Sequence, residues 1–387
     1  MAFGLSLAVL LGLARWNLWA AMVLGAGVLG FLTTPAGPLL TSFGRTLADP
    51  GVVALAVTVG LIPLVGAVLE RTGRMESLLA RVPRRKAIFA AAPAIFGLLP
   101  IPGGALLSAP FLERVGGGRP EDRAAANVWF RHVFLFVYPV SSALIAAAKL
   151  AGTEVWRVLP YQLPWAVLAG LLGWAWLLRP FSGPVENLDP GPHWSFLFPL
   201  AVLLVAPALD LLLKRTVSLP APEVATLIAV TGSFFLALRG GFPVRELPAL
   251  IGTAKPWRFS LIVVGMFLYL AAFQASGLPG QLAALALPPL GLVLGVGVLM
   301  GLATGRQQAA ISVVIPVYLA AQGSLSPWAF SVVYQAAYLG YLLSPLHPCL
   351  TVSAEYAGTT LGATWRRLLP PSGIALLAAV AVGFAVL

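Results

Sequence analysis

Long apolar stretches separated by short polar connections run through almost the whole chain. An α-helix rises about 1.5 Å per residue, so stretches of about twenty residues match the ~30 Å hydrocarbon core of a bilayer. The pattern therefore predicts a protein built from membrane helices. The apolar stretches cover residues 2–14, 17–33, 50–70, 87–113, 124–151, 160–178, 194–213, 222–238, 257–275, 289–321, 326–357 and 367–387.

Two of these stretches are interrupted near their centres. Residues 87–113 contain Leu-Pro-Ile-Pro-Gly-Gly at 99–104, and residues 289–321 contain Ala-Thr-Gly-Arg-Gln-Gln at 303–308. Each arm has about 13 residues, or ~20 Å of helix, which is too short to cross the hydrocarbon core. We therefore expect two re-entrant helical hairpins, each entering and leaving on the same side of the membrane.

Prolines break two further stretches. Residues 326–357 contain Pro345 and Pro348, and residues 124–151 contain Pro139. Proline removes a backbone donor and clashes with the preceding turn, so an unbroken helix cannot hold both prolines of the second stretch. Interrupted helices near the middle of the bilayer are where secondary transporters place their substrate and ion sites.

The two halves of the chain repeat at an offset of 206 residues. Tyr-Pro-Val-Ser-Ser at 138–142 matches Ser-Pro-Leu-His-Pro at 344–348, and Pro110 matches Pro316. Each half is expected to hold five membrane helices, one of them broken, plus a hairpin. Five crossings invert the second half relative to the first, as in secondary transporters. The predicted units are the first repeat 1–180 (hairpin 87–113, broken helix 124–151), a linker 181–192, and the second repeat 193–387 (hairpin 289–321, broken helix 326–357).

Composition and charge agree with this architecture. The chain is 59% hydrophobic and 10% charged, whereas soluble proteins carry about 25% charged residues, so we expect an all-α polytopic membrane protein. Seventeen of its Lys and Arg residues fall in loops on one predicted side and four on the other, which makes the first side cytoplasmic. The seventeen are Arg15, Arg71, Arg74, Arg81, Arg84, Arg85, Lys86, Arg114, Arg119, Arg123, Arg179, Arg239, Arg245, Lys255, Arg258, Arg366 and Arg367.

The predicted sidedness depends on the first stretch. If residues 2–33 form two helices that part at Arg15, both termini face away from the cytoplasm. If they form one helix, the N-terminus lies inside. The apolar residues 2–13 lack a basic leader and a cleavage motif, so we interpret them as a membrane helix.

Arg306 is the most informative charged residue because it lies at the predicted tip of the second hairpin. A charge near the bilayer centre is costly and usually functional, and the helix that starts there offers free N–H groups to an anion. A guanidinium can also hold a carboxylate or similar oxyanion with two hydrogen bonds. The alternative is that Arg306 only braces the tip. The predicted substrate-binding residues of this tip are Thr304, Gly305, Arg306, Gln307 and Gln308.

The other tip and the two breaks complete the predicted site. The first tip offers backbone N–H groups, or is only a tight turn. Hydroxyls and unwound carbonyls in the breaks can ligate a coupling cation or orient the substrate. His347 can carry a proton, donate to the substrate or serve only as a packed polar residue. The predicted substrate-binding residues are Ile101, Pro102, Gly103 and Gly104 in the tip, and Ser141, Ser142, Ser344 and His347 in the breaks. The four residues of the breaks are also the candidates for binding the coupling ion.

Asn127, Arg131 and His132 lie on the first part of the first broken helix, where Asn127 and Arg131 share a face. They could line a cytoplasmic vestibule. The alternative is that Arg131 only snorkels toward the membrane surface. The one cysteine, Cys349, argues against a disulfide and a cysteine-based metal site. No catalytic motif, P-loop or basic-aromatic pattern is present, so we expect no enzyme, no cofactor, no metal and no nucleic-acid partner.

The segments 100–105 (Pro-Ile-Pro-Gly-Gly-Ala), 127–132 (Asn-Val-Trp-Phe-Arg-His) and 344–347 (Ser-Pro-Leu-His) resemble the domain-of-unknown-function 401 family. That family is placed in the ion transporter superfamily, with dicarboxylate/sodium symporters, citrate and arsenite carriers and gluconate permeases. The resemblance implies a homodimer in which a transport domain, holding both hairpins and both broken helices, moves like an elevator against a scaffold domain. The Ser-Asn-Thr tip signatures of the dicarboxylate branch are missing here.

The sequence thus predicts a secondary active transporter in the cell inner membrane. It would move a small anionic solute by alternating access, coupled to H⁺ or Na⁺. A cation/proton antiporter, a passive channel, and an intramembrane enzyme acting on a lipid-linked substrate are the alternatives. The solute, the coupling ion and the direction of transport stay open.

Overall fold

The protein is helical, as the apolar pattern predicts. Helices make up 83% of the computed structural model, and within the described residues the only β-type pairing is an isolated bridge between Arg84 and Pro184. The structure describes residues 1–387 except 15, 74–81, 83, 99–104, 185–195 and 285–287.

Helix boundaries recur along the chain at the predicted offset. Pro50 and Pro256 each begin a helix, as do Ser142 and Pro348, and both pairs are 206 residues apart. The first half comprises α1 (Ala2–Ala14), α2 (Leu18–Thr33), α3 (Ala36–Ala48), α4 (Pro50–Arg71), α6 (Arg85–Gly97), α7 (Ala105–Val115), α8 (Pro120–Val133), η1 (Phe134–Phe136), α9 (Ser142–Leu150), α10 (Val155–Leu172) and η2 (Gly173–Leu177). The second half comprises α11 (Leu197–Thr216), α12 (Pro222–Leu238), η3 (Val244–Glu246), α13 (Leu247–Ala254), α14 (Pro256–Ala275), α15 (Leu278–Ala284), α16 (Pro289–Thr304), α17 (Gln307–Gln322), α18 (Pro327–Leu343), α19 (Pro348–Tyr356) and α20 (Leu361–Val386).

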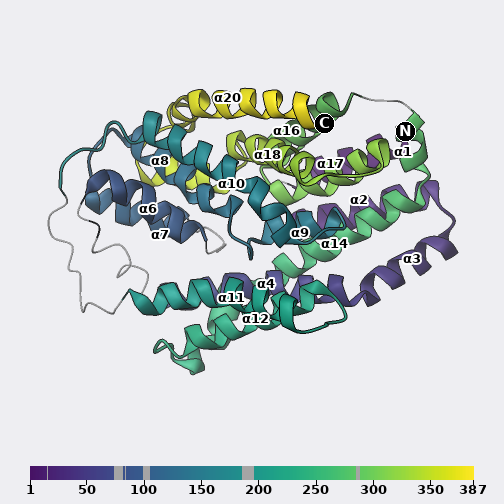
Figure 1. Ribbon diagram of the computed structural model, residues 1–387, viewed down its shortest axis with the longest axis horizontal. Coiled ribbons are helices and arrows are strands. Elements are labelled where there is room, and N and C mark those ends of the chain that lie inside the picture. The colour runs from purple at the N-terminus through teal and green to yellow at the C-terminus, as the bar shows by residue number, and fades with distance from the viewer. Residues whose placement is uncertain (15, 74–81, 83, 99–104, 185–195, 285–287) are drawn as a thin grey trace.

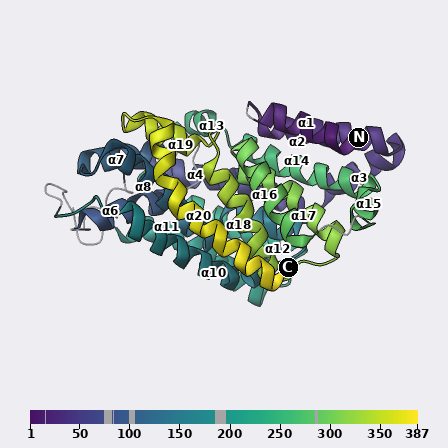
Figure 2. The ribbon, with the colours of Figure 1, turned by 90° about the horizontal axis from the view of Figure 1, so that it is seen from above.

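Five described helices are long and apolar enough to cross a membrane: α4, α10 with η2, α11, α14 and α20. Figure 1 shows α4, α11 and α12 along the lower side and α16, α18 and α20 along the upper side. In Figure 2, α6, α7 and α8 lie at one end of the molecule and α1, α2 and α3 at the other. The length and composition of these helices support a multi-pass membrane protein.

The first apolar stretch forms two helices. α1 ends at Ala14, and the Asn17 side chain caps α2 by accepting the Ala20 N–H at 3.4 Å. The alternative of one helix over residues 2–33 is therefore wrong. The structure also contains α3, which lies between the predicted apolar stretches 17–33 and 50–70; only Leu39 of α3 is buried.

α16 and α17 form a helical hairpin, and each of its arms is 16 residues long, whereas about 13 were expected. α16 ends at Thr304, its C-cap Gly305 has a φ of 63° in the left-handed region, and the chain returns as α17. α16 packs against α18 without room for side chains, because a Cβ on Gly301 would lie 2.6 Å from the Ala337 oxygen and from the Tyr341 nitrogen. Glycine permits this close approach of two backbones.

The broken helices have the predicted form. α18 stops at Leu343 and α19 starts at Pro348. In the first half, α8 passes into the short turn η1, and α9 starts at Ser142. The four residues 344–347 and the segment 137–141 are thus the two helix breaks, as the prolines indicate.

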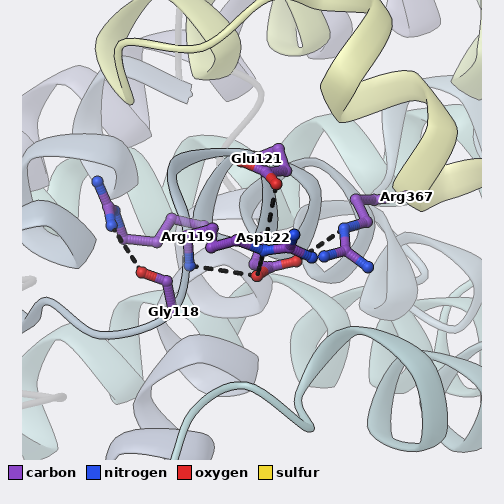
Figure 3. A network of polar contacts seen from close by, with 6 residues as sticks. Gly118, Arg119, Glu121, Asp122 and Arg367 are labelled. Carbon is purple, nitrogen blue, oxygen red and sulfur yellow. Dashed lines mark hydrogen bonds and ion pairs between the residues drawn. The ribbon is translucent and has the colours of Figure 1, made fainter.

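An ion pair joins the start of α8 to the start of α20. Asp122, almost fully buried, pairs with Arg367 at 2.9 Å and accepts the Arg119 backbone N–H at 3.2 Å, as Figure 3 shows. Arg119 also pairs with Glu121 at 3.2 Å. Buried Asp122 therefore fixes two helices that are far apart in the sequence at one end of the molecule.

Candidate functional site

A cavity of about 350 Å³ lies where the second hairpin meets both broken helices. Its other walls are formed by the turn between α1 and α2, by the end of α6 at Gly97 and Leu98, and by the segment from α13 into α14. This arrangement brings together parts of the chain that the sequence places hundreds of residues apart. The hairpin tip contributes Gly305, Arg306, Gln307 and Gln308 to the wall, and the first break contributes Ser141 and Ser142.

Helix ends of both polarities reach this cavity. α9, α17 and α19 begin there, at Ser142, Gln307 and Pro348, while α8 and α18 end close by, with His132 and Tyr341 on the wall. A helix end carries about half an elementary charge, positive at the N-terminus and negative at the C-terminus. These contributions partly cancel, so side-chain charges decide the sign of the electrostatic potential.

The side-chain charges are positive. Arg131, Lys255, Arg258 and Arg306 line the cavity, and no acidic side chain is among the described lining residues. Within the described chain, Lys255, Arg258 and Arg306 form no ion pair. Arg258 and Arg306 lie on the wall of the same cavity, where their like charges repel. The cavity therefore favours an anion.

The tip of the hairpin is held by Thr304. Its hydroxyl donates to the Met300 carbonyl at 2.7 Å and accepts the Arg306 N–H at 3.3 Å. Thr304 is buried and does not reach the cavity wall. The Arg306 side chain is half-buried and lies on the wall. Thr304 thus shapes the turn that presents Arg306.

The predicted residues of the second break lie behind the cavity wall. Ser344 donates to the Leu302 carbonyl at 2.6 Å and accepts the Leu346 N–H at 3.1 Å, so it ties the break to α16. His347 is fully buried, with its ring 4.1 Å from that of Tyr341 and 5.0 Å from that of His132. Neither Ser344 nor His347 lines the cavity. The predicted residues Ile101, Pro102, Gly103 and Gly104 lie outside the described part of the chain.

The two histidines belong to a small polar cluster. His132 Nδ1 lies 2.7 Å from the Val128 carbonyl oxygen, and its Nε2 lies 3.0 Å from the Tyr341 hydroxyl. His347 Nδ1 lies 3.4 Å from the Leu342 carbonyl oxygen. Cys349 is near both rings, and its sulfur is within 4.8 Å of a nitrogen of each.

Arg131 and His132 lie on the cavity wall. Asn127 has a different place. It accepts the Ser108 hydroxyl at 2.5 Å and donates to the Ser353 hydroxyl at 2.9 Å, which joins α7, α8 and α19. Asn127 is therefore a link between helices and not part of the cavity.

Several wall residues are not predicted from the sequence. Lys255 and Arg258 were assigned to a cytoplasmic loop because they flank the start of a membrane stretch, where basic residues usually report topology. Lys255 has a φ of 47°, the one positive value among the described non-glycine residues, which no local sequence signal reveals. The aromatic residues Trp16 and Trp19 at the α1–α2 turn also line the cavity.

Comparisons with known proteins agree with this architecture. Residues 3–387 match the family described as "Protein of unknown function (DUF401)". The fold is similar to that in the crystal structure of the Alcanivorax borkumensis YdaH transporter, with a TM-score of 0.55 and 18% identity over 94% of this chain and 95% of that chain. At this identity the similarity concerns the fold alone. No curated protein matches the sequence.

Proposed function

We propose that this chain, which belongs to the DUF401 family, is a secondary active transporter that moves a small anionic solute across the membrane by alternating access. The observation that carries the proposal is the charge of the cavity: four basic side chains and no acidic one among the described lining residues.

Cations that are held together away from bulk water repel one another strongly. Placing Arg258 and Arg306 on the wall of one partly enclosed cavity raises the free energy of the protein unless an anion neutralises them. A hydrogen bond from a guanidinium to an anion contributes roughly 1.5–3 kcal/mol. The partial charges of the helix ends are smaller than these full charges and oppose one another. An anionic solute is therefore favoured over a neutral or cationic one.

The position of the cavity supports alternating access. Lys255 and Arg258 line the cavity and belong to the loops that the charge bias predicts to be cytoplasmic. Trp16 also lines the cavity, and it follows Arg15, which is predicted to lie on the same side. We interpret the cavity as open toward the cytoplasm, with the hairpin tip closing the path beyond it. Inversion of two repeats would supply the matching outward-open arrangement.

Contacts between distant residues support the proposed sidedness. Arg71 pairs with Glu246 at 3.3 Å, next to Arg245, and both Arg71 and Arg245 were assigned to the cytoplasmic side. Asp122 lies between Arg119 and Arg367, which were also assigned to that side. The two termini would then face away from the cytoplasm.

The remaining parts of the proposal follow the superfamily resemblance. The hairpins and broken helices would form a mobile transport domain, and the other helices a scaffold through which two copies form a homodimer. Ser141 and Ser142, on the cavity wall, would orient the solute or a coupling H⁺ or Na⁺. Thr304, Ser344 and His347 would support this site from behind.

The test is transport by the purified protein in proteoliposomes. Counterflow is measured with a panel of carboxylates, sulfonates and phosphonates, with amines of similar size as the opposite-charge set. We expect saturable exchange of at least one anion, and accumulation against its gradient under an imposed H⁺ or Na⁺ gradient. Transport of amines without anions would refute the proposal, and flux that never exceeds equilibrium would indicate a channel.

Arg306→Gln supplies the residue-level test. Loss of one charged hydrogen-bonding group worth roughly 1.5–3 kcal/mol should raise KM by about ten- to a hundredfold. Arg45→Gln on exposed α3 removes the same charge away from the cavity and should leave KM unchanged. If Arg306→Gln and Arg306→Ala transport the anion as well as the unmodified protein, Arg306 does not hold the solute.

A further inference from the structure

Three side chains of the kind that bind metals meet beside the cavity. One ligand atom from each of His132, His347 and Cys349 lies within 4.8 Å of the other two. His132 and His347 are almost fully buried, while Cys349 is half-buried and reaches the cavity wall. The cluster therefore has an entry path, although the one cysteine in the sequence argued against a cysteine-based site.

Both imidazoles have the orientation that is common among metal-binding histidines. Each places Nδ1 near a backbone carbonyl oxygen, at 2.7 Å for His132 and 3.4 Å for His347. A carbonyl oxygen only accepts, so Nδ1 carries the hydrogen and Nε2 keeps its lone pair. Metal-binding histidines usually donate their second N–H in this manner.

His347 Nε2 provides an independent sign of a ligand. It is buried and has no hydrogen-bond partner within the described part of the chain. An unpartnered buried acceptor costs roughly 1–3 kcal/mol. His132 Nε2 has the Tyr341 hydroxyl at 3.0 Å, which a metal at that nitrogen would replace.

Cys349 supplies the third ligand atom of the cluster, a sulfur. It is the second residue of α19, and it lies on the cavity wall together with Arg131. A cysteine binds metals as the thiolate, so binding of the ion releases the thiol proton. A thiolate and two neutral imidazoles are ligands for thiophilic ions.

We propose that His132, His347 and Cys349 form a three-coordinate site for Cu(I), separate from the anion site that Arg306 would serve. Charge decides between candidate ions. Arg131 and Arg306 line the same cavity as Cys349, and a monovalent ion with one thiolate leaves the site neutral, whereas Zn²⁺ leaves a positive charge near two arginines. Bonds of about 2.0–2.3 Å require the most distant ligand atoms to approach by roughly 1 Å, which side-chain rotations can provide.

The experiment measures Cu(I) binding to the purified full-length protein in detergent, carrying an affinity tag without histidine, under anaerobic reducing conditions. Competition with a colorimetric Cu(I) chelator gives the affinity and stoichiometry. We expect one equivalent per chain, and a loss of at least about a hundredfold in affinity for Cys349→Ser and His347→Gln, since even supporting residues of metal sites contribute ten- to a hundredfold. Tyr338→Phe, which removes a nearby hydroxyl outside the ligand set, should bind as the unmodified protein does.

Two further measurements make the proposal falsifiable if a variant folds poorly. Cu(I) should protect Cys349, the chain's one cysteine, from alkylation in the unmodified protein. Tyr341→Phe should raise Cu(I) affinity by about two- to tenfold, because the metal no longer displaces a hydrogen bond. Affinity unchanged in Cys349→Ser, no protection from alkylation, or Zn²⁺ binding as tightly as Cu(I) would each overturn the proposal. These assays involve no transport, so they can fail while the anion carrier proposal stands.

Discussion

The contact between α16 and α18 allows a comparison of two glycines on one helix. At Gly301, an added Cβ would lie 2.6 Å from the Ala337 oxygen and from the Tyr341 nitrogen. Both are backbone atoms, so only a shift of a whole helix relieves the overlap. At Gly295, on the same helix, nothing lies within 4 Å of an added Cβ. Gly301→Ala and Gly295→Ala therefore make the same chemical change in opposite surroundings.

The expected magnitudes follow from this geometry. Replacing glycine by alanine inside a helix is favourable by roughly 0.5–1 kcal/mol when space permits. Overpacking a closely packed interior costs roughly 1–3 kcal/mol. Gly295→Ala should therefore stabilise the protein by up to about 1 kcal/mol, and Gly301→Ala should be less stable than Gly295→Ala by about 1–3 kcal/mol.

The assay is chemical unfolding of the purified variants in the same detergent, followed by helical circular dichroism. Gly301→Ala should also weaken solute binding, because displacement of α16 moves the tip that carries Arg306. Gly295→Ala should bind the solute normally. If Gly301→Ala unfolds at the same denaturant concentration as Gly295→Ala, the two backbones are not in the contact described here.

Two further substitutions test the tip and a buried ion pair. Gly305→Ala places a side chain on a residue with φ 63° and a Cβ 2.7 Å from the Leu346 backbone carbon, so we expect a loss of roughly 1–3 kcal/mol in the unfolding assay together with weaker solute binding; normal values of both would contradict the geometry of the tip. Asp210 is buried and pairs with Lys214 at 3.0 Å, so Asp210→Ala should cost roughly 3–5 kcal/mol. The double variant Asp210→Ala/Lys214→Met should recover part of this loss in the same assay, because no unpaired charge is left, and equal stability of the single and double variants would contradict the pairing.

Much of the fold was predictable because its signals are local. Apolar length predicts each membrane helix, and Pro345 with Pro348 predicts a break wherever the segment lies in space. Gly305 and its polar neighbours likewise mark the turn of the hairpin. Helices start at Pro50 and at Pro256, which are 206 residues apart.

The membership of the candidate site was less predictable. Thr304 and Ser344 belong to the predicted segments, but their hydroxyls are used by backbone groups of the hairpin and the break. Lys255 and Arg258 look like loop charges in the sequence and lie on the cavity wall in the structure. The rotation of a helix and its packing against distant helices decide which of its sides faces a cavity. The local sequence of the helix does not specify either of them.

The sequence by itself thus determined the apolar helices, the break before Pro348 and the location of Arg306 at a hairpin tip, since each follows from hydrophobicity, proline and glycine within a short window. Only the tertiary structure decided that Arg306 shares a cavity with Arg258 and that His132 meets His347 and Cys349. Arg258 is far from Arg306 along the chain, and His132 is far from the neighbouring His347 and Cys349. They come together because α16 packs closely on α18 and the breaks bring helix ends to one place. Charge and metal-ligand chemistry at this site are therefore properties of the packing.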